Sequence, residues 1–159
     1  MFLRLFNSSL DCEIGWRPIQ LGDRELCSKD AGFHVTQDAR QICADLGAKL
    51  PLPKSEAEYE DLRAIYGNSG VAIDATDLNQ DGIWEDSSGN VVEYLAEIWT
   101  SPTLPGPYLE TGQASSLDPR PESEFVYKAY YAQSKVFIHC LKKPVYEPPT
   151  PVAGDVFIT

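Results

Sequence analysis

The sequence predicts a single domain of the α+β class, in which two helices precede a series of short strands. Two changes of pattern along the 159 residues carry this prediction. Apolar residues recur at helical spacing between residues 36 and 67, and from Gly70 onward they alternate with a period of two. An apolar content of 43% is enough for one hydrophobic core, and the chain is too short for a second large domain.

The N-terminal part favours strands. Residues 2–6 alternate loosely and predict a short strand, and residues 16–28 predict a hairpin with its turn at Gly22-Asp23. Cys12 and Cys27 flank this hairpin, so that a local disulfide between them would contribute about 3 kcal/mol in the loop-entropy model.

The first predicted helix contains about ten residues. Thr36 is a suitable N-cap, and Gly47 can take the left-handed conformation that ends a helix. The apolar positions between them recur at i, i+3, i+4 and i+7: Ala39, Ile42, Cys43 and Leu46. This spacing places Cys43 on the buried face of the helix.

A second helix is predicted after residue 55 and ends at Gly67. Ser55 and Glu58 have the spacing of a capping box. The inner stripe is formed by Tyr59, Leu62, Ile65 and Tyr66. This helix and the one before it form the helical part of the predicted fold.

The rest of the chain predicts strands around a long irregular loop. The predicted strands cover residues 71–74, 82–84, 90–94, 124–131 and 135–143. Residues 100–124 contain five prolines and show no periodicity, which predicts a long irregular loop. Loops of this length are usually functional or disordered. The candidate ligand-binding residues lie in or beside it: Tyr108, Glu110, Asp118, Arg120 and Tyr130. Residues 144–159 predict a Pro-rich linker that leads to a strand-like run at 155–159.

The charge of the chain excludes polyanionic partners. The formal net charge is −11, and the largest basic cluster along the sequence is the pair Lys142 and Lys143. We therefore expect binding neither to nucleic acid nor to an anionic membrane. The opening residues 1–12 lack the apolar core of a signal peptide, and no apolar run approaches the roughly 20 residues that span a bilayer.

The four cysteines are compatible with two disulfides in an oxidising compartment or with buried thiols in a reducing one. Their spacing contains no Cys-x-x-Cys pair, which disfavours a zinc knuckle or a redox motif. Asn7 begins an N-glycosylation sequon and is a candidate glycosylation site. Together these features predict a secreted or extracellular protein, and the sequence alone leaves three disulfide pairings open.

The order of these motifs resembles the C-type lectin-like domain, in its long form with an N-terminal hairpin. The opening of that family is similar to Cys12, Gly15-Trp16 and Cys27. Its two helices are similar to Ala39, Cys43, Gly47, Ala48 and Leu50 and then to Pro53, Ser55 and Glu58. Its later strands are similar to Thr76-Asp77, Gly82, Trp84, Gly89 and Cys140.

The resemblance covers about residues 11–143, which leaves residues 1–10 as an N-terminal tail and 144–159 as a Pro-rich C-terminal tail. It implies two disulfides, Cys12–Cys27 and Cys43–Cys140. The longer bridge would contribute about 4 to 5 kcal/mol in the loop-entropy model. The resemblance also implies that Trp16, Trp84 and Trp99 belong to the core.

The sugar-binding members of this family hold calcium with Glu-Pro-Asn or Gln-Pro-Asp in the long loop and with Trp-Asn-Asp before the last strand. None of these triplets occurs in residues 100–135. The remaining metal candidate is the series Asp77, Asn79 and Asp81 followed by Gly82, but an EF-hand loop would need a glutamate where Ser88 stands. We interpret the series as a tight turn, with a weak calcium site as the alternative if Glu85, Asp86 or Glu110 folds over it.

The sequence offers no catalytic site and implies no cofactor. Its two histidines are His34 and His139, and His139 stands beside a cysteine that we expect to be oxidised. We expect an extracellular module for protein recognition or assembly, of the adhesion or matrix type, that does not bind sugar through calcium. The alternatives are a carbohydrate-binding lectin with unconventional ligands and a structural subunit that polymerises through its tails.

Overall fold

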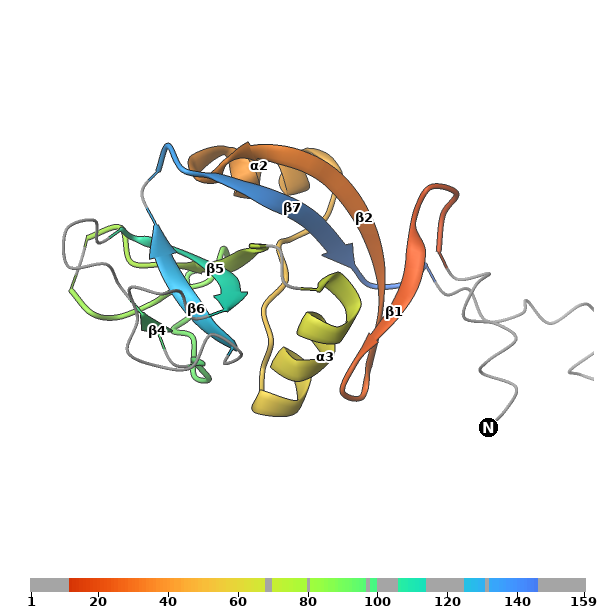
Figure 1. Ribbon diagram of the computed structural model, residues 1–159. Helices are drawn as coiled ribbons and strands as arrows, with labels where there is room; N and C mark the ends of the chain where they lie inside the picture. Colours follow the sequence, from red (N-terminus) through yellow and green to blue (C-terminus); the bar gives the residue numbers. More distant parts are fainter. Residues whose placement is uncertain are drawn as a thin grey trace, which may run out of the picture.

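The computed structural model describes residues 12–67, 70–79, 81–96, 98–99, 106–113, 125–130 and 132–145. In chain order the elements are β1 (Arg17–Leu21), β2 (Arg24–Val35), the 3₁₀ turn η2 (Thr36–Asp38), α2 (Ala39–Asp45), α3 (Glu56–Tyr66), β3 (Ala72–Thr76), β4 (Ile98–Trp99), β5 (Tyr108–Gln113), β6 (Phe125–Tyr130) and β7 (Lys135–Lys142). The predicted α+β class is confirmed, with two helices packed on two small sheets (Figure 1). No helix among these residues is both long and apolar enough to span a membrane.

The first sheet has the order β1-β2-β7, with antiparallel pairs throughout. Its β1-β2 hairpin turns at Gly22, as predicted, with φ of 56°. The backbone N–H of Gly22 donates to Asp61 of α3 at 2.7 Å, so that the hairpin is held against the helix. The strand predicted at residues 2–6 lies outside the described residues.

The second sheet has the order β3-β5-β6-β4, in which only the short β4 runs parallel to its neighbour. The prediction of an irregular loop over residues 100–124 is wrong for part of that stretch, because β5 forms within it. Leu109, Glu110 and Thr111 are all buried, since β5 lies between β3 and β6 and both its faces are covered. A strand buried on both faces shows no alternation of polar and apolar residues, which is why the period-two pattern missed it.

Two other predicted strands are wrong. Residues 82–84 and 90–94 form no strand, and the chain there makes only isolated bridges, Thr76 with Glu85 and Glu85 with Val91. The apolar residues that suggested strands instead pack individually, Trp84 and Tyr94 being partly buried against the main core.

The helix α2 is shorter than predicted and begins differently. The expected N-cap Thr36 opens the 3₁₀ turn η2, and its hydroxyl donates to the carbonyl oxygen of Ser134 at 2.7 Å. The N-cap position of α2 is instead Asp38, and no side chain caps the helix there. The α-helix proper has seven residues, Ala39–Asp45, and Gly47 follows it with φ of 71°.

The helix α3 follows the prediction closely. Ser55 accepts a hydrogen bond from the N–H of Glu58 at 3.2 Å, and Gly67 ends the helix with φ of 77°. The Glu58 carboxylate accepts from the N–H of Lys54 at 2.8 Å and pairs with Arg24 of β2. The cap therefore also ties the start of α3 to the first sheet.

Two cores hold these layers together. The larger lies between α3 and the two sheets, around Leu62, Leu109 and Tyr127. The smaller lies between α2 and β7, and it contains Cys43 and Cys140. Disulfides join Cys12 to Cys27 and Cys43 to Cys140, the pairs that the resemblance implies. The second bridge spans 97 residues and would contribute about 4 to 5 kcal/mol in the loop-entropy model.

Candidate recognition surface

The segment after β3 forms a tight turn that is built on its own backbone. The two carboxylate oxygens of Asp77 accept from the N–H groups of Asp81 and Gly82, at 3.0 and 2.8 Å. The Asp81 carboxylate accepts from the N–H of Ile83 at 2.9 Å, a bond that lowers the pKa of Asp81. Gly82 has φ of 88°, the conformation that glycine adopts most easily. The interpretation of this segment as a turn agrees with these bonds.

The same bonds bear on the metal question. Each oxygen of Asp77 accepts a backbone N–H, so the carboxylate has hydrogen-bond partners without a cation. Ser88 accepts a hydrogen bond from Lys49 at 2.6 Å, so it does not turn toward Asp77 as a ligand would. In the part of the chain that the structure describes, no three His, Cys, Asp or Glu side chains gather in a way that could hold a metal ion.

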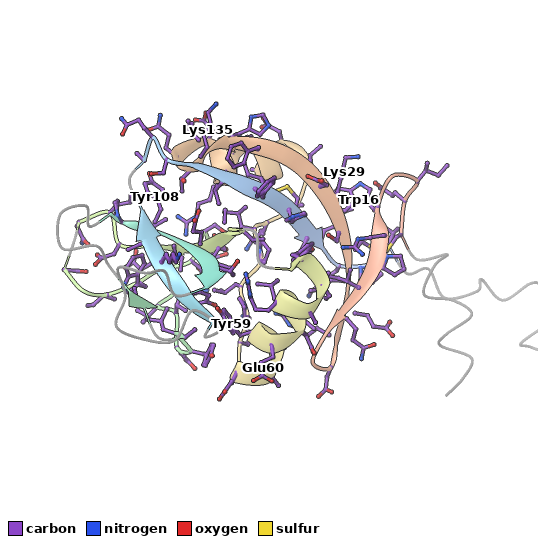
Figure 2. All side chains as sticks on the ribbon, in the orientation of Figure 1. Trp16, Lys29, Tyr59, Glu60, Tyr108 and Lys135 are labelled. Carbon is purple, nitrogen blue, oxygen red and sulfur yellow. A yellow bond between two sulfur atoms is a disulfide. The ribbon has the colours of Figure 1, made fainter. Side chains whose placement is uncertain are left out.

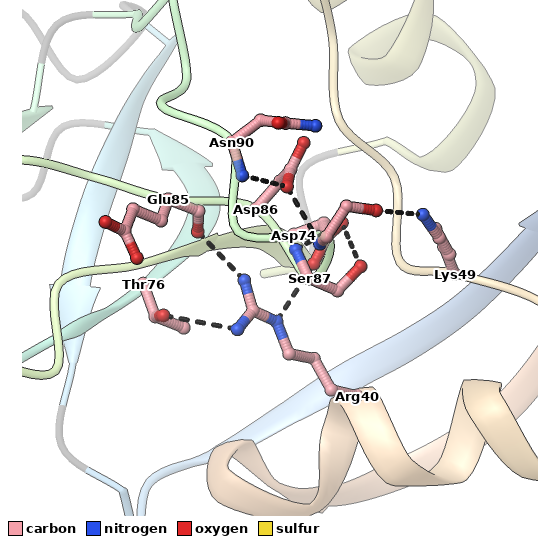
Figure 3. A network of polar contacts seen from close by, with 9 residues as sticks. Arg40, Lys49, Asp74, Thr76, Glu85, Asp86, Ser87 and Asn90 are labelled. Carbon is pink, nitrogen blue, oxygen red and sulfur yellow. Dashed lines mark hydrogen bonds and ion pairs between the residues drawn. The ribbon is translucent and has the colours of Figure 1, made fainter.

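Arg40, which extends from α2, connects this turn to the helix (Figure 3). Its Nε donates to Asp74 Oδ1 at 2.9 Å. Its terminal nitrogens donate to Thr76 Oγ1 at 3.3 Å and to the carbonyl oxygen of Glu85 at 2.9 Å. One guanidinium therefore contacts β3 and the segment that follows the turn, and holds both against α2.

Asp74 is the buried centre of this network, with 3% of its surface exposed. Its second oxygen, Oδ2, accepts from the N–H and the hydroxyl of Ser87, at 3.2 and 2.8 Å. A buried carboxylate is costly unless donors surround it, and here Arg40 and Ser87 supply them. The sequence analysis did not single out Asp74. The sequence does contain one signal that could have identified it. Asp74 is the only acid in β3, and a buried acid needs donors from elsewhere in the chain.

A second turn follows at residues 86–90. The Asp86 carboxylate accepts from the N–H groups of Ser88 and Asn90, at 2.8 and 3.0 Å. Partial burial would raise the pKa of Asp86, but these two donors outweigh burial and lower it. The ammonium groups of Lys49 and Lys54 act in the same direction. Residues 77–90 therefore form two successive rigid turns.

The first turn displays apolar side chains to solvent. Leu78 is 61% exposed and Ile83 is 47% exposed, although both are large and apolar. Leu78 also lines a cavity of about 170 Å³ together with Tyr108, Gln37 and Arg40. We call Leu78, Ile83 and Tyr108 the turn surface. The sequence analysis missed Leu78 and Ile83, because single apolar residues in a turn carry no periodicity.

The predicted ligand-binding residues are separated by the fold. Tyr108 is half-buried at the start of β5, where it pairs with Thr76 beside the turn (Figure 2). Glu110 is buried, with 8% of its surface exposed, and its carboxylate lies against Gly70, where an added Cβ would come within 2.6 Å of it. Glu110 therefore does not lie on the surface that Tyr108 shares. Asp118, Arg120, Asn7 and the side chain of Tyr130 lie outside the described part of the structure.

The predicted packing role of His139 agrees with its contacts. Its ring stacks on Tyr66 with the centroids 4.0 Å apart, and burial lowers the pKa of the imidazole. The neighbouring Cys140 is bound in a disulfide, so these two residues form no Cys–His dyad. Trp16 and Trp84 are partly buried against the two cores, whereas the side chain of Trp99 is outside the described set.

Comparison with known proteins gives structural neighbours only. No protein-family model matches the chain, and no curated protein sequence matches it. The carbohydrate-recognition domain of the mouse scavenger receptor C-type lectin superposes with a TM-score of 0.64 and 16% identity, over 86% of this chain and 100% of that one. A calcium-independent type II antifreeze protein does so with a TM-score of 0.61 and 19% identity, over 84% and 95%.

A third neighbour is the C-type lectin domain of murine dendritic cell inhibitory receptor 2, solved in complex with an N-glycan. It superposes with a TM-score of 0.60 and 14% identity, over 83% of this chain and 98% of that one. Identities this low establish a shared fold and nothing finer. The helices, the two sheets, the disulfide pairing and these neighbours agree that the chain has the C-type lectin-like fold.

Proposed function

We propose that this protein is an extracellular recognition module that binds a protein partner through the turn surface and without calcium. The observation that carries the proposal is the turn at residues 77–83, whose carboxylates are occupied by their own backbone while Leu78 and Ile83 face solvent. The turn thus presents apolar contact area, and a partner that covers it gains the free energy of apolar burial.

The anchoring of the turn supports this proposal. Arg40 bonds both sides of the turn to α2, and Asp74 bonds the segment beyond it. A surface that is already ordered loses little conformational entropy when a partner binds, and rigid presentation of an apolar side chain is typical of protein interfaces. The polar rim is supplied by Gln37 and Arg40, which line the cavity beside Leu78.

Independence from calcium is supported by the absence of the family's calcium triplets from residues 100–135 and by the bonds of Asp77. One structural neighbour is itself described as calcium-independent, so the fold accommodates this property. An extracellular location is supported by the two disulfides, which persist in oxidising compartments. We infer no catalytic role.

The test is a binding screen with a tetramer of the biotinylated protein. It is applied to an array of extracellular proteins and to a glycan array, each with calcium and with EDTA. We expect a protein target whose binding persists in EDTA. Binding to that target should fall more than tenfold in Leu78→Asp, because about 1.5 to 3 kcal/mol of apolar burial is lost and a charge is buried.

Val145→Asp is the matched control, since Val145 is 54% exposed and does not belong to the turn surface. It should leave binding unchanged. Glycan binding that EDTA abolishes would refute the proposal and establish the lectin alternative. Equal loss of binding in the two variants would show that the turn surface is not the contact.

A further inference from the structure

A groove made of two adjoining cavities runs along the segment 47–54, which precedes α3. One cavity of about 340 Å³ lies between the segment 47–54 and the end of β7, and a second of about 520 Å³ extends along residues 90–94. The two cavities share Leu52, Lys54 and Asp86, so they adjoin at these residues. Each volume falls in the range of roughly 300 to 1,000 Å³ that is common for ligand sites in proteins.

The first cavity gathers positive charge in a strongly acidic protein. The chain has 13 Lys and Arg residues and 24 Asp and Glu residues. The cations that line the first cavity are Arg24, Lys49, Lys54, Lys142 and Lys143, against two acids, Asp74 and Asp86. Cations held close together repel one another, and they favour an anion that enters between them. We call this end of the groove the cationic end.

Structural roles account for only part of this charge. Arg24 pairs with Glu58 at 2.7 Å, and Lys142 pairs with Glu13 at 2.8 Å. Lys54 and Lys143 form no ion pair with any residue that the structure describes. The Lys49 ammonium bonds the Ser88 hydroxyl at 2.6 Å.

The bridge between residues 49 and 141 holds the cationic end in place. The N–H of Lys49 donates to the carbonyl oxygen of Leu141 at 2.9 Å, and the N–H of Leu141 donates back at 2.7 Å. These two bonds fix the backbone of residue 49 beside the end of β7, close to Lys143. The cationic end is therefore part of the ordered fold.

Beyond the residues that the two cavities share, the lining of the second cavity is apolar or uncharged except for Glu93. The floor of the cationic end is formed by leucines: Leu26, Leu50, Leu52 and Leu141. The far end has Val91, which is 60% exposed, and the half-buried ring of Tyr94. Glu93 lies on the same stretch. The second cavity therefore adds one acid and no further cation to the charges of the cationic end.

We propose that this groove binds an extended peptide segment of a protein partner, with an acidic side chain at the cationic end and an apolar side chain over Val91 and Tyr94. The proposal rests on the proposed function, since it names the chemistry of a protein partner. The two adjoining cavities can take successive side chains of an extended segment, and the leucine floor fits the aliphatic part of a glutamate or aspartate and its neighbours. Lys54 and Lys143 supply the charge that pairs with its carboxylate.

The charge pattern distinguishes a peptide from a polyanionic sugar. A sulfated polysaccharide carries negative charge at every repeat, so it would meet Asp86 and Glu93 along the groove. The cationic end also has no aromatic side chain among its lining residues, and sugar rings commonly stack on such side chains. A peptide can place its acid at one end only, and this matches the groove.

The test uses fluorescein-labelled, end-blocked peptides and fluorescence anisotropy. The probe contains Glu-Glu-Gly-Leu-Leu, made in both chain directions, and its control has glutamine in place of each glutamate. We expect the acidic probe to bind at least about tenfold more tightly than the glutamine control, because only the acidic probe forms the charge-assisted bonds. The double variant Lys54→Gln/Lys143→Gln should weaken binding of the acidic probe by a similar factor.

Lys135→Gln is the matched control. Lys135 is exposed and begins β7, whereas the groove lies at the other end of that strand (Figure 2). This variant should bind like the parent, and circular dichroism should show that all variants remain folded. The proposal would be overturned if the acidic and glutamine probes bound equally well. It would also be overturned if Lys135→Gln lost as much affinity for the acidic probe as Lys54→Gln/Lys143→Gln.

A sulfated oligosaccharide such as a heparin fragment is measured in the same assay. If it binds more tightly than the peptide and depends on Lys54 and Lys143, the occupant is a sugar and the peptide proposal is wrong. Partner binding in EDTA that depends on Leu78 but not on Lys54 or Lys143 would leave the proposed function intact while refuting the groove as a contact. These measurements therefore distinguish failure of the peptide proposal for the groove from failure of the proposed function of the turn surface.

Discussion

Removal of Arg40 is expected to release the turn from α2 and to destabilise the whole domain. The variant Arg40→Met keeps the aliphatic part of the side chain and removes the three donors that reach Asp74, Thr76 and Glu85. The side chain of Asp74 is 4% exposed, so its carboxylate would stay buried with only Ser87 as partner. A buried charge that loses its partner costs about 3 to 5 kcal/mol.

That figure is an upper range, because the side chain of Arg40 is 30% exposed and water screens part of the interaction. We therefore expect the free energy of unfolding to fall by about 2 to 3 kcal/mol. For a domain of this size, that loss lowers Tm by about 8 °C. The assays are urea unfolding followed by circular dichroism and thermal unfolding by calorimetry.

A double-mutant cycle tests the reasoning directly. Asp74→Asn removes the charge and leaves a side chain that can still accept from Ser87, and the double variant Arg40→Met/Asp74→Asn then contains no buried unpaired charge. We expect the double variant to be more stable than the sum of the single effects predicts, by about 1 kcal/mol or more. Lys135→Met is the control for loss of an exposed cation and should change stability by less than about 0.5 kcal/mol. Additive effects, or a loss below about 1 kcal/mol in Arg40→Met, would refute the buried network as a source of stability.

Three further predictions concern other features. Millimolar calcium should leave the Tm of the parent unchanged, because among the described residues no three acidic, histidine or cysteine side chains gather around a metal position and Asp77 already bonds its own turn. A rise in Tm that Asp77→Asn abolishes would contradict this. Burial lowers the pKa of His139 below 6.5, the usual imidazole value, so the free energy of unfolding should be highest above pH 6.5 and should decline as pH falls below it. This decline should be smaller in His139→Phe, and equal pH profiles of the two proteins in urea unfolding would contradict the prediction. The double variant Cys43→Ser/Cys140→Ser should lose about 4 kcal/mol of unfolding free energy, and a loss below about 1 kcal/mol would contradict the loop-entropy account.

The features that the sequence predicted well depend on neighbours along the chain. The cap of α3 by Ser55 and its end at Gly67 are set within a few residues, and so is the hairpin turn at Gly22. The turn after β3 is likewise local, because Asp77 bonds residues four and five positions later. Such patterns can be read directly from spacing.

The features that the sequence did not predict depend on distant partners. The hydroxyl of Thr36 bonds Ser134, nearly a hundred residues away, and Thr36 opens the 3₁₀ turn that precedes α2 instead of capping the helix. β5 contains Glu110 and Thr111 at buried positions, which only the strands on either side explain. Arg40 and Asp74 lie 34 residues apart, and no local pattern indicates that they pair. Spacing along the chain carries no information about such contacts.

The groove was missed for the same reason. Lys49 and Lys54 stand in one segment and Lys143 in another, far along the chain, and the only basic pair in the sequence is Lys142 and Lys143. The bridge between Lys49 and Leu141 brings these segments together. A basic site can therefore exist in a protein of net charge −11 without any basic run in its sequence.

The bridge between Cys43 and Cys140 also determines how the protein responds to proteolysis. It closes a covalent ring that contains α3, the turn surface and the whole second sheet. A protease that cuts the ring once, anywhere between the two cysteines, opens it but separates no fragment. A nicked molecule would keep its full mass on a non-reducing gel and divide into two pieces only after reduction. For an extracellular recognition module of the kind proposed, a single cleavage would not detach the turn surface from the rest of the chain.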